Sequence, residues 1–196
     1  MKFFKKLYLL ITIFVINSCF SEDGTNKTPL WIVTAWENVH RYHQNQDYWD
    51  EGDLFAKNHS FRGVSSNNSH GLIIVGQDGN IWQSSDAGLT WDNRTSGNVN
   101  TTRLWEVAFN SGNYVAVGDS GVIITSTDGI TWDNRTSGVT IKLRGIAFGN
   151  STYVTVGQTG TILSSSDSIS WTSRTSGTGK YLYGISYLND KFIAVG

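Results

Sequence analysis

The stretch SSDAGLTWDNRTSG, residues 84–97, decides the fold, because close copies of it return twice further along the chain. STDGITWDNRTSG occupies residues 126–138, and SSDSISWTSRTSG occupies residues 165–177. A catalytic site is normally built once in a chain, so three copies of one polar loop indicate a repeated architectural unit. We call residues 84–91, 126–132 and 165–171 the acid–tryptophan turns.

The rest of each unit repeats with a similar period. Val-Gly pairs end at Gly76, Gly118, Gly157 and Gly196, which are 42, 39 and 39 residues apart. The third unit contains four β-rich runs separated by turn residues, namely LRGIAF, TYVTVG, TILSSS and WTSRTS. Four antiparallel strands in about 40 residues are typical of one β-propeller blade. We therefore predict an all-β chain, a β-propeller of four-stranded antiparallel blades.

The acid–tryptophan turns have a chemistry that suits a tight reversal between the third and fourth strands. The Asp carboxylate can accept backbone N–H groups, Gly88 or Gly129 can adopt positive φ, and the Trp can pack between blades. Ser168 replaces this glycine in the third copy, which predicts a strained or different turn. We assign structural roles to Ser84, Asp86, Gly88, Thr90, Trp91, Ser126, Asp128, Gly129, Thr131, Trp132, Ser165, Asp167, Ser170 and Trp171.

The spacing Ser-x-Asp-x-Gly-x-Thr-Trp of the first copy, one residue shorter in the other two, resembles the Asp-box or BNR repeat. The resemblance covers about residues 61–196. The Val-Gly, Gly-x-Ile and Trp…Ser-Gly elements look most similar to the photosystem II assembly/stability-factor-like propellers and their bacterial lipoprotein relatives. In that family the box is a structural turn, generally away from the active site. The resemblance therefore implies a fold and leaves the activity open.

The first 18 residues have the pattern of a secretory signal. Lys2, Lys5 and Lys6 precede an apolar run, residues 7–16, which is too short to span a hydrocarbon core of about 30 Å. Cys19, the only cysteine, follows in a lipobox-like context that resembles bacterial lipoprotein signals; the alternative is an ordinary signal peptide with an incidental cysteine. We expect lipidation of Cys19, a tether over residues 19–28, export from the cytoplasm and anchoring to a membrane of the bacterial cell envelope.

The charge of the chain argues against nucleic acid as a partner. Removal of residues 1–18 takes away three of the 15 basic residues and none of the 16 acids, which leaves a net charge of −4. Binding to nucleic acid normally needs a basic patch, and none is expected here.

The number of blades is left open by the sequence. Residues 61–196 supply three units and the first two strands of another, and propellers close with about 4 to 8 blades. Residues 29–60 form either a degenerate first blade or strands that close the ring, since Trp49 lies 42 residues before Trp91. Otherwise the chain, with about 3.5 to 4 blades, is part of a larger propeller. Its open blade edge would then favour self-association.

Arg94, Arg135 and Arg174 occupy equivalent places in the three units and are candidate contacts for an anionic ligand. The alternative is that each pairs locally, for example with Asp92 or Asp133. Sialidases also grip a carboxylate with three arginines, but from non-equivalent loops, and glycoside hydrolysis requires two positioned carboxylates. The acids of this repeat belong to turns, so we expect no catalytic residue.

Residues 37–53 are rich in histidine and acids, which raises the question of a metal site. His40 and His43 have a spacing that suits ligands on a helix, whereas on a strand they would face opposite sides. We expect no metal and no cofactor. The sequence thus predicts a non-enzymatic exported lipoprotein that binds an unknown protein or glycan. The alternatives are a sialidase-like glycoside hydrolase and a photosystem-type assembly factor.

Overall fold

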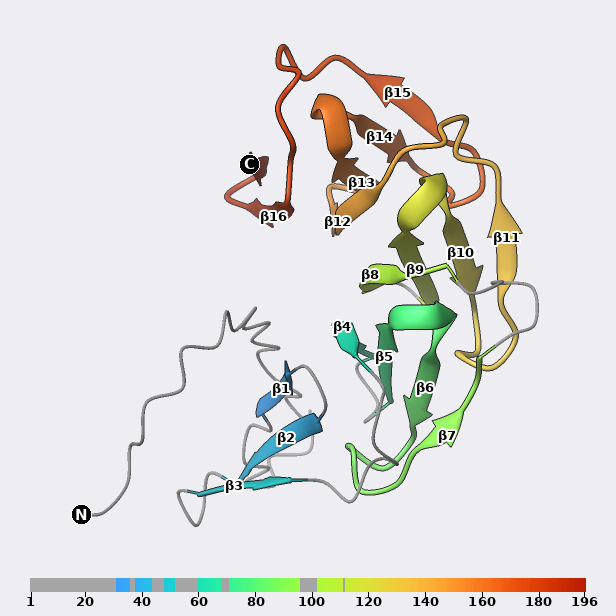
Figure 1. Cartoon of the computed structure of the whole chain (residues 1–196), viewed down its shortest axis with the longest axis vertical. Coiled ribbons are helices and arrows are strands. Elements are labelled where there is room, and N and C mark those ends of the chain that lie inside the picture. Colours follow the sequence, from blue (N-terminus) through green and yellow to red (C-terminus); the bar gives the residue numbers. More distant parts are fainter. Residues whose placement is uncertain are drawn as a thin grey trace.

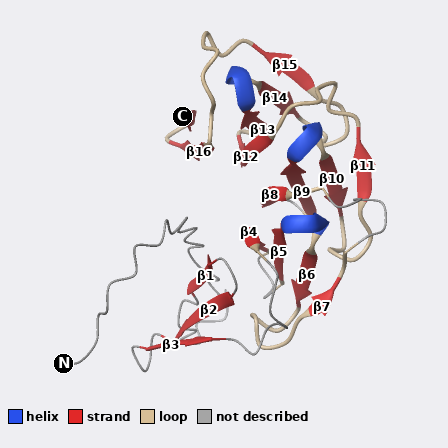
Figure 2. Cartoon of the chain, in the orientation of Figure 1, coloured by secondary structure: helices blue, strands red, loops and turns tan. Residues whose placement is uncertain are grey.

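The computed structural model describes residues 31–35, 38–43, 48–51, 60–67, 71–95, 102–110 and 112–196. Antiparallel sheets follow one another along an arc, as Figures 1 and 2 show. The short helical segments are 3-10 turns between the second and third strands of a blade: Gln77–Gly79, Asp119–Gly121 and Gln158–Gly160. No helix within the described ranges has the length and apolar character needed to cross a membrane.

Each of the three repeat units forms one four-stranded blade, as predicted. The first blade contains β4 (Phe61–Ser66), β5 (Leu72–Gly76), β6 (Ile81–Ser84) and β7 (Asp92–Asn93). The second contains β8 (Leu104–Asn110), β9 (Asn113–Gly118), β10 (Ile123–Ser126) and β11 (Asp133–Arg135). The third contains β12 (Leu143–Gly149), β13 (Thr152–Gly157), β14 (Ile162–Ser165) and β15 (Thr172–Arg174). The strands β4, β8 and β12 line the inner side of the arc (Figure 1).

Two smaller sheets accompany the three blades. β16 (Gly184–Leu188) and β17 (Lys191–Val195) form the first two strands of a further unit, and β16 contacts β12. β1 (Trp31–Ala35), β2 (Asn38–His43) and β3 (Tyr48–Glu51) form a three-stranded sheet, of which β1 contacts β4. Among the described strands, none of β1–β3 pairs with β16 or β17, so the ring-closing ladder considered above is not formed between them.

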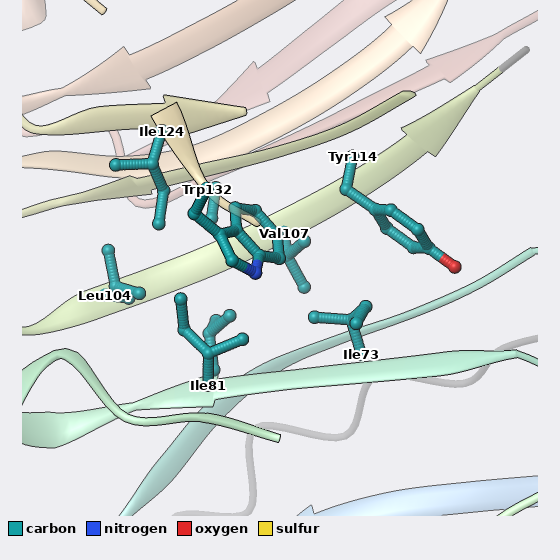
Figure 3. Packing of buried hydrophobic residues seen from close by; sticks show 9 residues of the cluster. Ile73, Ile81, Leu104, Val107, Tyr114, Ile124 and Trp132 are labelled. Carbon is teal, nitrogen blue, oxygen red and sulfur yellow. The ribbon is translucent and has the colours of Figure 1, made fainter. Parts of the chain in front are cut away.

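Apolar side chains on both faces of the second strands hold neighbouring blades together. Each residue of β5 is buried, which fits a strand covered on both sides rather than an alternating one. Figure 3 shows Ile73 and Ile81 of the first blade packed with Leu104, Ile124 and Trp132 of the second. The opposite face of the second blade packs against the third through Val115, Val117, Ile123, Leu143, Ile146, Tyr153 and Leu163.

The Val-Gly pair at the end of each second strand brings that strand close to the start of the first. The backbone N–H of Asp119 donates to the carbonyl oxygen of Arg103 at 2.9 Å. A Cβ on Gly118 would collide with this carbonyl oxygen. Glycine is thus required by close approach of two backbones. The contact fixes the path of the chain where β8 begins.

Candidate functional site

The acid–tryptophan turns are held by hydrogen bonds within each turn. In the second copy, the Asp128 Oδ1 atom accepts the N–H groups of Ile130 at 2.7 Å and Thr131 at 2.8 Å. The Ser126 hydroxyl accepts the N–H of Gly129 at 2.8 Å and donates to Asp128 at 2.9 Å. The Trp132 indole N–H donates to the Gly129 carbonyl. The first and third turns form related hydrogen bonds. The residues involved are Ser84, Asp86, Gly88, Thr90 and Trp91 in the first turn, and Ser165, Asp167, Ser170 and Trp171 in the third.

These bonds keep the turn carboxylates ionised, and each carboxylate accepts hydrogen bonds within its own turn. Backbone N–H groups of Ser170 and Ile169 lower the pKa of Asp167 to about 2. Burial alone would raise the pKa of Asp86, but bonds from Thr90 and Ser84 outweigh it and lower the pKa to about 2. The acids belong to three different blades and each stabilises its own turn.

The third turn keeps the conformation of the second although serine replaces glycine. Ser168 has φ of 62°, compared with 72° for Gly129. This left-handed region is unfavourable for residues with a Cβ. The buried Ser168 hydroxyl donates to the Asp167 carbonyl oxygen at 2.5 Å and accepts from the Asn113 amide of the second blade. These hydroxyl contacts hold Ser168 in the left-handed conformation.

Arg94, Arg135 and Arg174 lie at the outer strands of separate blades and do not converge. Each Nε atom donates to the third strand of its own blade, at 3.1 Å, 2.8 Å and 2.8 Å, respectively. Arg94 also pairs with Asp92 at 2.9 Å, and Arg135 pairs with Asp133 at 3.1 Å. Their contact with a ligand stays a prediction.

The structure gives less information on the remaining candidates from the sequence, which are the lipidation site and the two histidines. Cys19 and the tether over residues 19–28 lie outside the described residues. His40 and His43 lie three positions apart on the strand β2. Among the residues whose side chains are described, no three His, Cys, Asp or Glu residues lie close enough to hold a metal ion.

A different group of side chains converges where the inner strands begin. The guanidinium carbons of Arg144, Arg103 and Arg62 lie 3.6 Å, 5.0 Å and 5.1 Å from the centre of the Trp105 ring. The guanidinium carbon of Arg144 also lies 5.5 Å from the centre of the Tyr183 ring. We call Arg62, Arg103, Lys142, Arg144, Trp105 and Tyr183 the cationic–aromatic cluster.

The local fold explains why these side chains meet. Arg62, Trp105 and Arg144 are the second residues of β4, β8 and β12, which lie side by side on the inner side of the arc. A register shift occurs at this point in all three strands, opposite the second strand of each blade. The repeated bulge therefore presents three equivalent positions of neighbouring blades to one another.

Among the described side chains, the cluster has more positive than negative charge. Of these, Asp119 supplies a carboxylate: it accepts the Trp105 indole N–H at 2.7 Å and lies 3.9 Å from the Lys142 ammonium. No carboxylate of the described residues forms an ion pair with Arg103 or Arg144. Burial, followed by the charges of Arg103 and Arg144, lowers the pKa of Arg62. A guanidinium stays protonated in proteins, so the cluster repels further cations and attracts a carboxylate or phosphate.

The cluster and the acid–tryptophan turns lie on opposite faces of the arc. Strands alternate in direction within a blade, so the first strand begins at the end that holds the turn between the second and third strands. The acid–tryptophan turn joins the third and fourth strands at the other end. A partner on the cationic face would therefore leave those turns uncovered.

Sequence reasoning missed the cluster, although the repeat contains a signal for it. The inner strands β4, β8 and β12 begin with FRGV, LWEV and LRGI, at Phe61, Leu104 and Leu143, and the matching run LYGI of the last unit starts at Leu182, two residues before β16. The second position therefore holds Arg, Trp, Arg and Tyr on successive units. An alignment of the units at this position would have shown cationic and aromatic residues alternating along one edge.

Comparison with known proteins supports the fold. No protein-family model and no curated protein matches the chain. A solved chain described as YCF48 bound to D1 peptide has a TM-score of 0.67 at 14% identity, covering 93% of this chain and 60% of that chain. YCF48 from Cyanidioschyzon merolae gives 0.63 at 16%, covering 94% and 62%. A chain of a nidogen/laminin complex gives 0.65 at 14%, covering 87% and 68%.

The chain thus spans about 60% of the YCF48 chains that it matches. At these identities the similarity concerns the fold, and the chain is a β-propeller built from four-stranded antiparallel blades.

Proposed function

We propose that this propeller is a binding module that takes an acidic peptide segment of a protein partner in the cationic–aromatic cluster. The observation that carries the proposal is the convergence of three guanidinium groups on Trp105, with no carboxylate paired to Arg103 or Arg144 among the described residues. A planar guanidinium can bind a carboxylate through two parallel hydrogen bonds. Trp105 and Tyr183 offer apolar surface for the rest of the peptide.

The solved structures lend support of a general kind. A propeller of the same fold is described as bound to a peptide, and another belongs to a complex of two proteins. The turn acids are each engaged in their own turn, which gives no support to a hydrolase that uses them.

Binding of an acidic peptide to single-arginine variants tests the proposal. The probe is a fluorescein-labelled peptide rich in Asp and Glu, measured by fluorescence anisotropy beside its Asn/Gln counterpart. Hydrogen bonds to charged groups contribute about 1.5–3 kcal/mol, so Arg144→Ala should weaken binding by about 10- to 150-fold. Higher salt should weaken it further.

Arg174→Ala is the matched control, because Arg174 lies on the outer strand β15 and bonds to Ser164 of its own blade. This variant should bind the acidic peptide like the wild type. Equal affinity for the acidic and the amide peptide, or an equal loss in Arg144→Ala and Arg174→Ala, would contradict the proposal.

The proposal also covers where the protein is located and what the acid–tryptophan turns contribute. The propeller is exported and held at the cell envelope by a lipid on Cys19, a role based on the signal-like residues 1–18. The acid–tryptophan turns are Asp-box turns that serve as structural joints, supported by their internal hydrogen bonds.

A further inference from the structure

Two equivalent joints between blades differ in how they are filled. At the joint of the first and second blades, Gln83 of β6 spans the gap. Its Nε2 atom donates to the Asp128 carbonyl oxygen of the next blade at 3.0 Å, and its Oε1 atom accepts from Arg94 Nε at 3.1 Å. A Cβ on Gly129 would approach this amide to 2.8 Å, so the joint has no spare room.

At the joint of the second and third blades, Thr125 takes the place of Gln83. Thr125 Oγ1 accepts from Arg135 Nε at 2.8 Å, as Gln83 accepts from Arg94. The threonine side chain lacks the amide group that would reach the acid–tryptophan turn of the third blade. A pocket of about 260 Å³ remains between Thr125, Arg135 and the turn residues Asp167–Ile169. We call it the joint pocket.

The joint pocket combines hydrogen-bond donors, acceptors and one apolar side. Arg135 has five N–H donors, of which Nε bonds to Thr125 and Nη2 bonds to Asp133, so others remain. Asp133 supplies carboxylate oxygens as acceptors. The Asp167 carboxylate, whose Oδ1 atom accepts from Ser165, Ile169 and Ser170 within its turn, adds a second negative charge. Ile169 is 54% exposed and supplies apolar surface.

The charges of this lining select the class of ligand. Two carboxylates and one guanidinium give a negative balance, which disfavours an anion. A neutral ligand with several hydroxyl groups can both donate to Asp133 and accept from Arg135. Pockets for drug-sized ligands measure roughly 300–1,000 Å³, so 260 Å³ suits a single ring.

We propose that the joint pocket binds one neutral sugar ring, with hydroxyl groups on Asp133 and Arg135 and a carbon–hydrogen face on Ile169. Glycan binding then occurs on the face of the propeller opposite the cationic–aromatic cluster. The same chain could hold a glycan and an acidic peptide at once.

Saturation-transfer NMR of the whole chain tests this site, with the methyl glycosides of glucose, galactose and N-acetylglucosamine as probes. At least one should bind with a Kd in the millimolar range, with amide shifts at Thr125, Arg135 and Ile169. Thr125→Gln installs the side chain that fills the neighbouring joint. This variant should lose binding at least about tenfold and should melt at the wild-type temperature or above.

Two further variants keep the test decisive. Asp133→Asn removes an exposed carboxylate without changing its volume, and it should also weaken sugar binding. Gln83→Thr alters only the other joint and should leave sugar binding unchanged. Failure of all three glycosides to bind, or binding that neither Thr125→Gln nor Asp133→Asn weakens, would overturn the site. Peptide binding should persist in Thr125→Gln, so this outcome is separate from the proposed function.

Discussion

Glu106 occupies a position of the inner strand where the first and third blades have glycine. Gly63 and Gly145 stand at the equivalent places of β4 and β12. The Glu106 side chain is 7% exposed, and its Oε1 atom accepts the N–H of Val107 at 3.3 Å. Burial raises the pKa of Glu106 well above its ordinary value of 4.5, because the charged carboxylate would lose its hydration.

Stability should therefore fall with rising pH in a way that depends on Glu106. Above about pH 4.5 the unfolded chain releases this proton, while the folded chain keeps it until the raised pKa is reached. The free energy of unfolding then falls by up to about 1.4 kcal/mol per pH unit over this range. Glu106→Gln should remove this component, which urea unfolding from about pH 4 to 8 would measure. An unchanged slope in the variant would contradict a buried neutral acid.

The tryptophan of an acid–tryptophan turn stabilises the joint to the preceding blade. Trp132 belongs to the second blade, is 2% exposed and packs with Ile73 and Ile81 of the first (Figure 3). Val75 of the first blade belongs to the same cluster. Trp171 of the third blade packs in the same way against the second. The turn thus fixes both the chain reversal within a blade and the seating of one blade on another.

Trp132→Ala should destabilise the protein by about 3–5 kcal/mol, because it leaves a cavity between two blades. Thermal or urea unfolding would measure the loss. Trp91→Ala is the control: Trp91 has the same place in the first turn but is only half-buried, so its loss should cost less than half as much. Equal costs for the two variants would show that burial between blades is not what Trp132 contributes.

The strands and the turns could be predicted from sequence because they repeat. The four runs of the third unit correspond to β12, β13, β14 and β15, since the period and the turn residues mark each strand. The cationic–aromatic cluster could not be predicted in the same way. Arg103 precedes its strand by one residue, and Arg62 and Arg144 come from other blades. Their convergence depends on how the inner strands lie side by side.

The joint pocket could not be predicted from the sequence for a related reason. Gln83 and Thr125 occupy the same position of two units, and both accept a hydrogen bond from an arginine. The folded structure shows the difference: the Gln83 amide reaches the Asp128 carbonyl oxygen of the next blade, whereas the shorter Thr125 side chain has no amide that could do so. Arg135 was a candidate ligand contact from the sequence, but its neighbours Thr125, Asp167 and Ile169 come together only in the folded chain.

The propeller presents two faces with different chemistry. The start of the inner strands carries the cationic–aromatic cluster, and the opposite end carries the acid–tryptophan turns and the joint pocket. The described sheets follow an arc, with β16 near one end and β1–β3 near the other (Figure 1). The two proposed binding faces on one stack of blades suit a module that holds two partners at once.

The anchor proposed for this module depends on Cys19. Cells expressing the full chain and fed alkyne-palmitate should incorporate the label into the wild type and lose it in Cys19→Ala. Ser21→Ala is the control, because it changes a neighbouring tether residue and leaves the cysteine. The label should remain in that variant. Labelling that persists in Cys19→Ala would contradict lipidation at this residue.

The proposed binding of an acidic peptide at Trp105 can be tested most directly through the indole N–H of this residue, which donates to Asp119 in the free protein. Titration of the acidic peptide into isotope-labelled protein should shift the Trp105 indole signal in the ¹H–¹⁵N spectrum, together with the side-chain signals of Arg103 and Arg144. A saturating titration that leaves these three signals in place would contradict the account.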